Sequence, residues 1–414
     1  MRPLTLLALG LTASLLAACG RAPDLAGSGT TGTLAPQATS GITSFRHPGI
    51  ALSRANLDRI RLAVQNRTEP TSSGWVRLTS SPFASPAHVA RPKSQITTRK
   101  GGPYADPSGP YGSGDLEMRE DSFAAFANAL EWYVTGQEQH AKAAIRIMNA
   151  YSEVSPTIDG SNAELLAAHT AVQWANAAEI IKHTYKPTSS PGWTSAAHQS
   201  FARMLRDKFY GVIQNFLPDT YAGNWDAAVI NAMMAMGVFL DDIPMFNRGW
   251  DRYMGTQGSG ALQNYIAPVT YEVAETCRDQ EHAQMGLGYL AGAAEIAYNQ
   301  GSDALYSAHE YRLLRGYEFE ANYILSRGQS ATLRRCPASK TQPLPDDIAK
   351  VRGDGIQRYP VWEIMHNHYH DRRQFNTTYS RQIVLDVRAR LGGEGYNHTL
   401  LGFGTALYAR PTTP

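Results

Sequence analysis

The chain has 414 residues, of which 43% are apolar and 18% are charged, and its formal net charge is +2. A chain of this length and apolar content can bury one large core or two smaller ones. The nearly balanced charge and the lack of a long basic run argue against a nucleic-acid-binding protein.

The first 19 residues have the pattern of an export signal. Arg2 supplies a short positive region, and residues 4–16 form an apolar stretch that is too short for a mature membrane-spanning helix. The run Leu16-Ala17-Ala18-Cys19 resembles the bacterial lipobox, in which small residues precede a cysteine that becomes lipidated. An ordinary signal peptide cleaved after small residues is the alternative. Both predict export, and the lipobox predicts a lipoprotein that Cys19 anchors to a membrane of the cell envelope, in the periplasm or at the cell surface.

Residues 20–44 separate this signal from the folded part of the chain. They are rich in Gly, Ser, Thr, Ala and Pro and contain almost no large apolar side chains, which is typical of a flexible tether. The folded domain is therefore predicted to span residues 45–414. It begins with a helix over residues 54–66 and continues with an irregular region over residues 68–120, where Pro and Gly recur.

From residue 121 onward, apolar residues recur at helical spacing. The predicted helices cover residues 123–134, 141–151, 163–185, 201–216, 229–240, 243–255, 282–299, 310–324, 360–370 and 378–391. Residues 400–409 fit either a short strand or a helix end, and no run between 121 and 327 has the alternation of a strand. Consecutive amphipathic helices with short connections pack as antiparallel hairpins, and the lack of a fixed repeat favours a ring over a solenoid. The predicted fold is all-α, an α/α toroid built as an incomplete barrel of antiparallel helical hairpins.

A polar stretch, Glu275–Gln284, opens one of these helices. Arg278 and His282 lie one helical turn apart and point the same way. Arg278 is a permanent cation that can grip a carboxylate through two bonds, and His282 titrates near neutrality and can transfer a proton. The alternative is a polar helix start whose groups satisfy one another. The functional interpretation makes this stretch the rim of an active site.

A second candidate is Asn224, which stands with Trp225 and Asp226 at the start of another predicted helix. Asn224 and Asp226 can both cap that helix, which is the structural interpretation. The functional interpretation is that the Asn224 amide meets a substrate carboxylate at the positive end of the helix.

Three histidines, His366, His368 and His370, occur at every second position around Tyr369. On a strand all three would share a face, whereas on a helix only His366 and His370 would. Zinc or manganese is one interpretation of such a cluster in an exported protein. However, no HExxH motif or cysteine-based finger is present, and the prediction is that this cluster holds no metal. A further interpretation makes Tyr369 and a neighbouring His acid–base groups that face the toroid cavity.

Carboxylates offer a different chemistry. Glu275, Glu281 and Glu363 could supply the acid and the base of a glycoside hydrolase. The sequence has no Ser-centred nucleophile elbow, no Walker loop and no dinucleotide fingerprint.

Two cysteines, Cys277 and Cys336, lie beyond the signal. An exported protein folds in an oxidising compartment, so the two could form a disulfide. That bond would tie the loop before Arg278 to the loop after Arg335.

Several of these stretches occur together. They are Asn224-Trp225 ahead of a Met- and Ala-rich helix, Cys277–Gly288, Ala294–Gly301, and Pro360–Glu363 running into Asn367-His368-Tyr369. Over roughly residues 45 to 409 this set resembles the alginate lyase domain family, whose members are α/α-toroid polysaccharide lyases. The resemblance implies β-elimination on a uronic-acid polymer, with no metal or organic cofactor.

The resemblance also implies roles for the candidate residues. Asn224 would neutralise the substrate carboxylate with the help of Arg278, which acidifies the C5 proton of the sugar. His282 would take part in proton transfer. Tyr369, or Tyr359 as the second choice, would protonate the departing glycosidic oxygen.

Trp225 marks a departure from the pattern of some members of the family, in which a His follows the Asn directly. The base must therefore come from elsewhere in the chain, and His282 is inferred for that role. The substrate-binding candidates are Trp225, Gln284, Glu363 and His368.

The predicted function is a polysaccharide lyase that cleaves an anionic, alginate-like uronate polymer by carboxylate neutralisation and His/Tyr acid–base chemistry. Preorganised amide and guanidinium donors suit this reaction, because the C5 proton is a poor acid. The alternatives are a glycoside hydrolase on the same scaffold and a glycan-binding surface lipoprotein without catalysis. The predicted partners are the polysaccharide and, through the lipid anchor only, the membrane.

Overall fold

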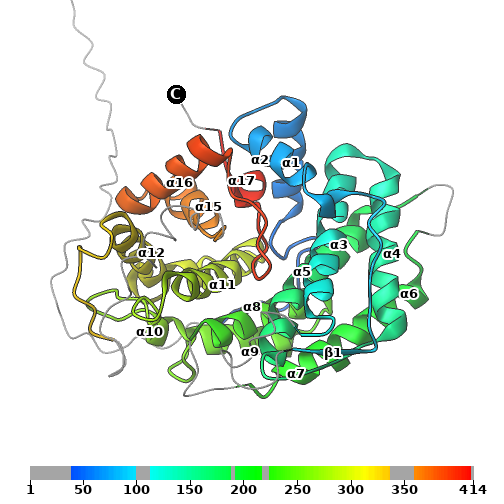
Figure 1. The fold of residues 1–414 in the computed structure, drawn as a ribbon, viewed down its shortest axis with the longest axis horizontal. Helices are drawn as coiled ribbons and strands as arrows, with labels where there is room; N and C mark the ends of the chain where they lie inside the picture. The colour runs from blue at the N-terminus through cyan, green and yellow to red at the C-terminus, as the bar shows by residue number, and fades with distance from the viewer. Residues whose placement is uncertain (1–38, 99–111, 188–191, 217–222, 336–358, 412–414) are drawn as a thin grey trace, which may run out of the picture.

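The computed structural model describes residues 39–98, 112–187, 192–216, 223–335 and 359–411. Helices dominate these residues and follow one another around an open ring (Figure 1). The arrangement agrees with the predicted incomplete barrel of helical hairpins.

Four long helices form the inner layer of the ring. They are α3 (Asp115–Thr135), α5 (Ala163–Thr184), α8 (Gly223–Phe239) and α11 (Gln280–Asn299). Every residue of α8 is buried, and α3, α5 and α11 are buried over most of their circumference. A helix that is apolar nearly all round needs neighbours on every side, which is why these segments occupy the inside of the ring.

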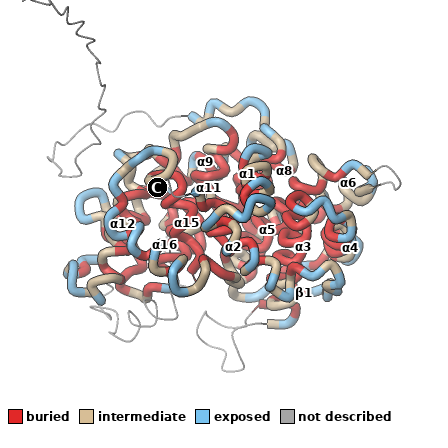
Figure 2. Tube along the Cα trace, turned by 90° about the horizontal axis from the view of Figure 1, so that it is seen from above, coloured by how far each residue is buried: buried red, intermediate tan, exposed pale blue. Residues whose placement is uncertain are grey.

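The outer layer consists of helices that follow the inner ones in the chain and expose one face (Figure 2). They are α4 (Glu138–Val154), α6 (Ser195–Met204), α9 (Ile243–Met254) and α12 (Ala304–Leu325). A π-helical turn, Leu205–Tyr210, and the short α7 (Gly211–Ile213) extend α6, and α12 is non-helical at Ala308–Tyr311. The apolar residues of each outer helix fall on one side and pack against the inner layer, and the polar residues face outward. Each inner helix and the outer helix that follows it therefore form one helical hairpin.

Three inner helices, α5, α8 and α11, run in the same direction. At one end, Glu275, which lies shortly before α11, bonds to Asn224 in the first turn of α8. At the other end, the segment 46–51 bonds to Glu179 near the end of α5, to Asp241 just after α8 and to Gln300 just after α11. The positive ends of these helix dipoles therefore lie on one side of the ring and the negative ends on the other.

The short α10 (Leu262–Tyr265) packs between α9 and α12. The remaining helices complete the ring between α12 and α3. They are α1 (Arg54–Gln65), α2 (Thr71–Thr79), a 3-10 turn (Pro82–Ala84), α15 (Trp362–Met365) with a π-helical turn (His366–Arg372), α16 (Thr378–Leu391) and α17 (Gly404–Tyr408). The C-terminal α17 packs beside α1 and α2, so the last helix of the described chain meets the first two (Figure 1).

The described parts of the region 68–120, residues 68–98 and 112–120, contain more regular structure than their Pro and Gly content predicts. They include α2, the start of α3, and the strand β1 (Gln95–Thr97), which pairs in parallel with β2 (Thr157–Asp159). Helix α2 has weak local propensity, but its Trp75 and Leu78 are buried, and the Cα of Gly74 lies so close to the α17 backbone that a Cβ would meet the Ala406 nitrogen at 2.6 Å. Tertiary contacts therefore determine this helix. The ambiguous residues 400–409 contain a short helix, α17.

The predicted signal, most of the tether and the predicted lipidation residue Cys19 lie outside the described residues. Among the helices of the described ranges, none combines the length and the apolar character needed to cross a membrane.

Candidate active site

The first part of the site is the pairing of Asn224 with Glu275. Asn224 is the second residue of α8 and is fully buried. Its backbone N–H and its Nδ2 both donate to the Glu275 carboxylate, at 2.8 Å each, and Tyr265 donates its hydroxyl to the same carboxylate at 3.3 Å. The Asn224 Oδ1 has no hydrogen-bond partner among the described residues. Glu275 thus occupies the positive end of α8, where a helix dipole favours an anion.

Arg278 joins this pair from the turn before α11. Its Nη1 donates to Glu275 Oε1 at 2.9 Å, and its Nε lies 3.7 Å from a carboxylate oxygen of Asp279. Burial lowers the pKa of Arg278, but a guanidinium remains charged at neutral pH. The structure therefore brings Asn224 and Arg278 together around one carboxylate, as the sequence predicted for a substrate, but the carboxylate is the protein's own.

His282 lies in the first turn of α11 and is held by Asp279, the residue that caps this helix. The Asp279 carboxylate accepts the His282 backbone N–H at 2.8 Å and lies 2.7 Å from the ring Nδ1. Burial would raise the pKa of Asp279, but the hydrogen bond and the charge of His282 keep it below its usual range. When Nδ1 carries the hydrogen and donates it in a hydrogen bond to this carboxylate, Nε2 is the ring atom that can take up a proton.

Both interpretations of the polar stretch therefore hold in part. Asp279 and His282 satisfy one another at a helix start, as the structural alternative requires. The His282 side chain nevertheless keeps 22% of its surface exposed, and the dyad has the orientation of a base with its supporting carboxylate.

A narrow pocket lies between the inner helices, and none of Asn224, Arg278 and His282 is among the residues that line it. His169 from α5, Asn231 from α8 and Tyr289 from α11 face it, together with Pro360, Val361, Ile364 and residues 399–402. The Tyr289 hydroxyl donates to the Thr399 carbonyl at 3.1 Å and lies 3.4 Å from His169 Nδ1. Burial raises the pKa of Tyr289 and lowers that of His169 well below its usual value, so the phenol keeps its proton and the imidazole is neutral at pH 7.

Gly292 permits the close approach of α8 and α11 beside this pocket. A Cβ at Gly292 would lie 2.8 Å from Nδ2 of Asn231, so a larger residue would push the two helices apart. The Asn231 Oδ1 and the His169 Nε2 are buried and have no hydrogen-bond partner among the described residues. Polar atoms of this kind, facing a pocket, are the groups that a polar ligand can satisfy.

The sequence analysis did not identify Tyr289, His169 or Asn231. A signal was present, since Asn231 follows Asn224 by seven residues and Tyr289 follows His282 by seven. Seven residues are about two helical turns, so each pair shares a helix face, with about 10 Å between its members along the axis. His169 has no such partner, and only the packing of α5 beside α11 reveals it.

Tyr369 and His368, by contrast, lie far from His282. Tyr369 is fully buried and donates its hydroxyl to the Tyr306 carbonyl at 2.7 Å. His368 Nε2 lies 3.1 Å from Asp303, and its ring stacks on Tyr306 with the centroids 3.6 Å apart. Asp303 follows the C-terminal end of α11, whereas His282 is at its start, and the 20 residues of that helix span about 30 Å. The geometry does not bring Tyr369 or His368 to the Asn224 rim.

The π-helical turn at 366–372 explains this position. It places His366 and His370 together, each close to Asp371 at 3.6 and 2.8 Å, and turns His368 to the other side. The expectation that only His366 and His370 share a face of a helix is confirmed.

The other substrate-binding candidates have partners inside the protein. Glu363 is buried, forms a bidentate ion pair with Arg388 at 2.8 and 2.7 Å, and accepts the Thr405 hydroxyl at 2.7 Å. Gln284 is buried and accepts the indole N–H of Trp362 at 3.0 Å. These contacts give both residues a structural role.

Trp225 and Tyr359 are both buried next to residues of the site or the pocket. Trp225 is buried next to Asn224, and its ring stacks on Phe216 with centroids 5.8 Å apart. Tyr359 is buried in the core immediately before Pro360, which lines the pocket. Tyr359 is therefore a neighbour of the pocket wall.

Two further predictions concern cysteine and carboxylate chemistry. Cys277 is disulfide-bonded, but Cys336 lies outside the described residues, so their pairing stays a prediction. Glu275 and Glu363 are each engaged by side chains of the protein at separate places, Asn224 for one and Arg388 for the other. This arrangement does not favour a hydrolase that uses the two as acid and base.

Comparison with known proteins provides an independent view. A family model described as alginate lyase matches residues 66–331. Among solved structures, alginate lyase A1-III from Sphingomonas species A1 superposes with a TM-score of 0.62 at 13% identity, covering 86% of this chain and 95% of that one. A variant of A1-III complexed with a tetrasaccharide gives the same values. An alginate lyase from Bacteroides ovatus gives a TM-score of 0.54 at 12% identity, covering 88% and 99%. No curated protein sequence matches the chain.

At these identities the solved structures show the fold, and they agree with the α/α toroid predicted from the sequence. The family match rests on the sequence itself and covers the three inner helices α5, α8 and α11 with the whole Asn224–His282 rim.

Proposed function

The chain belongs to the alginate lyase family, whose model matches more than half of it, and from this premise we propose how it acts as a polysaccharide lyase. The substrate is a uronate polymer of the alginate type. The carboxylate of one sugar binds at the rim formed by Asn224 and Arg278, and His282 and Tyr289 move the protons of a β-elimination.

The observation that carries this proposal is the convergence at the N-terminal ends of α8 and α11. An amide, a guanidinium and an Asp-supported imidazole lie within one partly buried network there. Two positive helix ends add to the same local potential. An anionic sugar is the class of ligand that this potential attracts.

The reaction itself requires three events at the sugar. A base removes the C5 proton, the electron pair forms the C4=C5 double bond, and the C4–O bond breaks as an acid protonates the departing oxygen. Donors aimed at the carboxylate stabilise the negative charge that develops as the proton leaves. Asn224 and Arg278 are the donors at the rim.

His282 suits the role of base. Asp279 holds the ring through Nδ1, so Nε2 is the free basic atom, and part of the ring is open to solvent. Tyr289 suits the role of acid, because burial keeps its phenol protonated and it lines the pocket together with His169 and Asn231. On this proposal Tyr289 takes the place that the sequence analysis assigned to Tyr369 or Tyr359.

Glu275 has a positioning role in this scheme. Its buried carboxylate holds both Asn224 and Arg278 in the absence of substrate. Burial raises the pKa of Glu275, which facilitates protonation when a second carboxylate arrives. A protonated Glu275 releases part of its hold on the two donors, which then turn to the substrate.

Incubation with alginate and glucuronan, followed by ultraviolet absorbance, tests the reaction. Unsaturated sugars absorb in this range, so a lyase produces a rising signal with at least one polymer. New reducing ends without this absorbance would indicate a hydrolase, and binding without either product would indicate the non-catalytic lipoprotein. Both of these outcomes contradict the proposal.

Export and lipid anchoring form a separate part of the proposal, which rests on the sequence alone. Residues 1–19 act as a lipoprotein signal, and Cys19 carries the lipid. Labelling of cells with a fatty-acid analogue checks this, because the wild-type protein takes up the label and Cys19→Ala does not. Equal labelling of the two proteins would exclude the anchor.

A further inference from the structure

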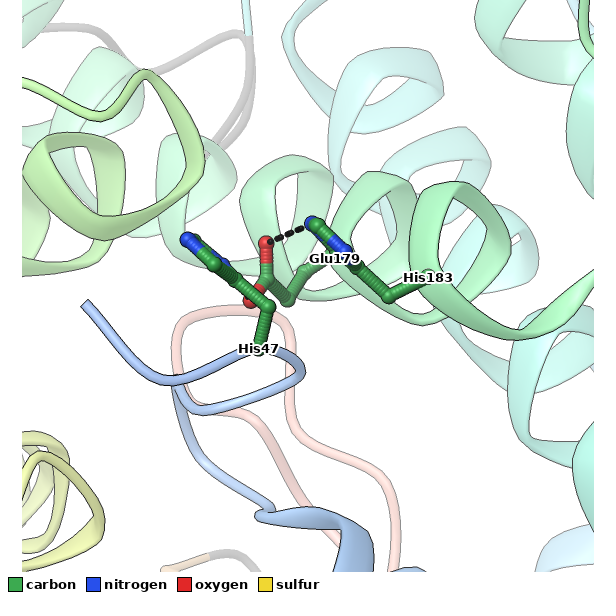
Figure 3. Close-up of side chains that lie close together, drawn as sticks. All are labelled: His47, Glu179 and His183. Atoms are coloured by element: carbon green, nitrogen blue, oxygen red, sulfur yellow. Dashed lines mark hydrogen bonds and ion pairs between the residues drawn. The ribbon is translucent and has the colours of Figure 1, made fainter.

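A cluster of His47, Glu179 and His183 lies at the C-terminal end of α5, on the side of the ring opposite to the Asn224 rim (Figure 3). Glu179 and His183 are one turn apart on the helix, and His47 reaches them from the segment before α1. The His47 Nδ1 lies 2.7 Å from Glu179 Oε1, and the His183 Nε2 lies 3.6 Å from Glu179 Oε2. One potential ligand atom from each residue lies within 4.8 Å of the others.

The hydrogen bonds within this cluster are incomplete. Glu179 Oε1 accepts the Gly49 N–H at 3.2 Å and faces His47. Glu179 Oε2 and His183 Nε2 are both buried without a hydrogen-bond partner among the described residues, although they face one another. A buried carboxylate oxygen without a partner is unfavourable, and the Glu179 side chain is only 1% exposed. A cation that contacts both atoms would satisfy them.

The chemistry of the three side chains and their place in the fold suit a metal ion. Neutral imidazole and carboxylate are the forms that bind metals. The C-terminal end of α5 adds a negative helix dipole, which favours a cation at this place.

Asp241 contacts His47 in the way that carboxylates contact metal-binding histidines in other proteins. It lies just after α8 and accepts a bond from His47 Nε2 at 2.9 Å, which leaves Nδ1 turned towards Glu179. Metal-binding histidines commonly hold a carboxylate through their second ring nitrogen, which orients the ring. Lys182 lies 3.6 Å from the other Asp241 oxygen.

We propose that this cluster is a structural site for a divalent metal ion, of which Zn²⁺ is the best match to two histidines and one carboxylate. His47 Nδ1, His183 Nε2 and the Glu179 carboxylate are the ligands, and Asp241 positions His47. The two imidazole rings lie nearly parallel, with centroids 4.3 Å apart and an angle of 9°, so one ring must turn for both in-plane lone pairs to reach one ion. The site does not depend on the proposed lyase reaction.

The ion would fasten the segment 46–51 to the inner helices. This segment is already bonded to the ends of the same layer, since Ala51 N–H donates to Asn176 at 3.0 Å and Asn299 donates to the Ile50 carbonyl at 2.8 Å. Ile50 and Ala51 also line the pocket that contains Tyr289. Metal binding at His47 therefore holds one wall of the pocket in place without taking part in proton transfer.

A second group, His366, His370 and Asp371, has the composition of a metal site as well. All three residues belong to one π-helical turn, so an ion there would join only neighbouring residues of the chain. The first cluster instead joins the segment before α1 to α5 and, through Asp241, to the end of α8. The second group is therefore the appropriate comparison in an experiment.

Zinc titration of the untagged protein, after treatment with a chelator, tests the site. We expect one Zn²⁺ per chain by calorimetry and by metal analysis, and a higher melting temperature in its presence. Glu179→Gln and His183→Asn should weaken zinc binding at least 100-fold. Asp241→Asn, which retains all three ligands, should weaken it about 10-fold to 100-fold.

Circular dichroism of each variant without metal ensures that a loss of binding reflects the site and not unfolding. His366→Asn is the control and should leave the affinity unchanged. A wild-type protein that binds no zinc at micromolar concentration would overturn the proposal. Loss of zinc in His366→Asn with retention in Glu179→Gln would assign the ion to the second group and would also overturn it.

Discussion

The two ends of the parallel inner helices differ in the chemistry that they hold. At the N-terminal ends of α8 and α11, Glu275 occupies the positive dipoles, and amide and guanidinium donors surround it. At the C-terminal ends of α5 and α8, imidazole rings meet Glu179 and Asp241. The same bundle thus offers one face suited to an anion and another suited to a cation. Parallel packing accounts for both, because an antiparallel bundle would cancel these fields.

Substitution of His282 is expected to have the largest effect at the N-terminal end. His282→Gln removes the proposed base and should reduce kcat by about 10²–10⁴ with a small change in KM. Steady-state assays by ultraviolet absorbance provide the measurement. His370→Asn is the matched control, because His370 also bonds an Asp through Nδ1, at 2.8 Å, but lies in the distant π-helical turn. Similar losses in the two variants would remove the case for His282 as the base.

Arg278 is expected to have the next largest effect. Arg278→Lys keeps the positive charge but loses the planar fork, and should reduce kcat by about 10²–10³. Arg388→Lys is the comparison, since Arg388 pairs with Glu363 away from the rim and should alter the melting temperature while kcat is retained. Unchanged kcat in Arg278→Lys would show that the guanidinium does not contact the transition state.

Substitution of two buried tyrosines is expected to have a smaller effect on kcat, and it tests which of them is the catalytic acid. The hydroxyls of Tyr289 and Tyr369 each donate to a backbone carbonyl, at 3.1 and 2.7 Å. Tyr289→Phe should reduce kcat by about 10², because it removes the proposed acid. Tyr369→Phe should reduce stability by about 1 kcal/mol through the lost hydrogen bond and leave kcat unchanged. The reverse result would restore Tyr369 as the catalytic tyrosine.

The smallest effect is expected at the C-terminal ends of α5 and α8, where protonation of His47 and Glu179 should make the stability of the protein depend on pH. Burial would lower the pKa of His47, but bonds to Glu179 and Asp241 raise it overall, and burial raises the pKa of Glu179. Both groups therefore bind protons more tightly in the folded state than in the unfolded state. Without metal, their contribution is complete at pH values below the unfolded pKa of each group and is lost as the pH rises through the folded values.

In the presence of a chelator, the difference in melting temperature between the wild-type protein and Glu179→Gln isolates the Glu179 contribution, and this contribution should fall as the pH rises from 5 to 8. With Zn²⁺ the trend should reverse, because protons compete with the metal for His47 and Glu179. Identical profiles with and without zinc would contradict the metal site, but they would leave the lyase proposal untouched.

Much of the fold could be predicted because its signals are local. Apolar residues at helical spacing located α5, α9, α11 and α16 to within a few residues, since a helix repeats every 3.6 residues whatever surrounds it. Helix α2 escaped prediction because contacts with α17, more than 300 residues later, stabilise it. Arg278 and His282 were predicted to lie one helical turn apart, but Arg278 lies in the turn before α11, and both residues instead contact Asp279, which caps the helix.

The sequence by itself determined the helical class, the family and one side of the candidate site, because periodicity and motif depend only on neighbours along the chain. The tertiary structure decided the rest. It paired Asn224 with Glu275 across 51 residues and placed Tyr289 in the pocket, with Tyr369 far away. It also brought His47 to Glu179 across 132 residues. These choices follow from the direction in which the inner helices pack, which no local pattern records.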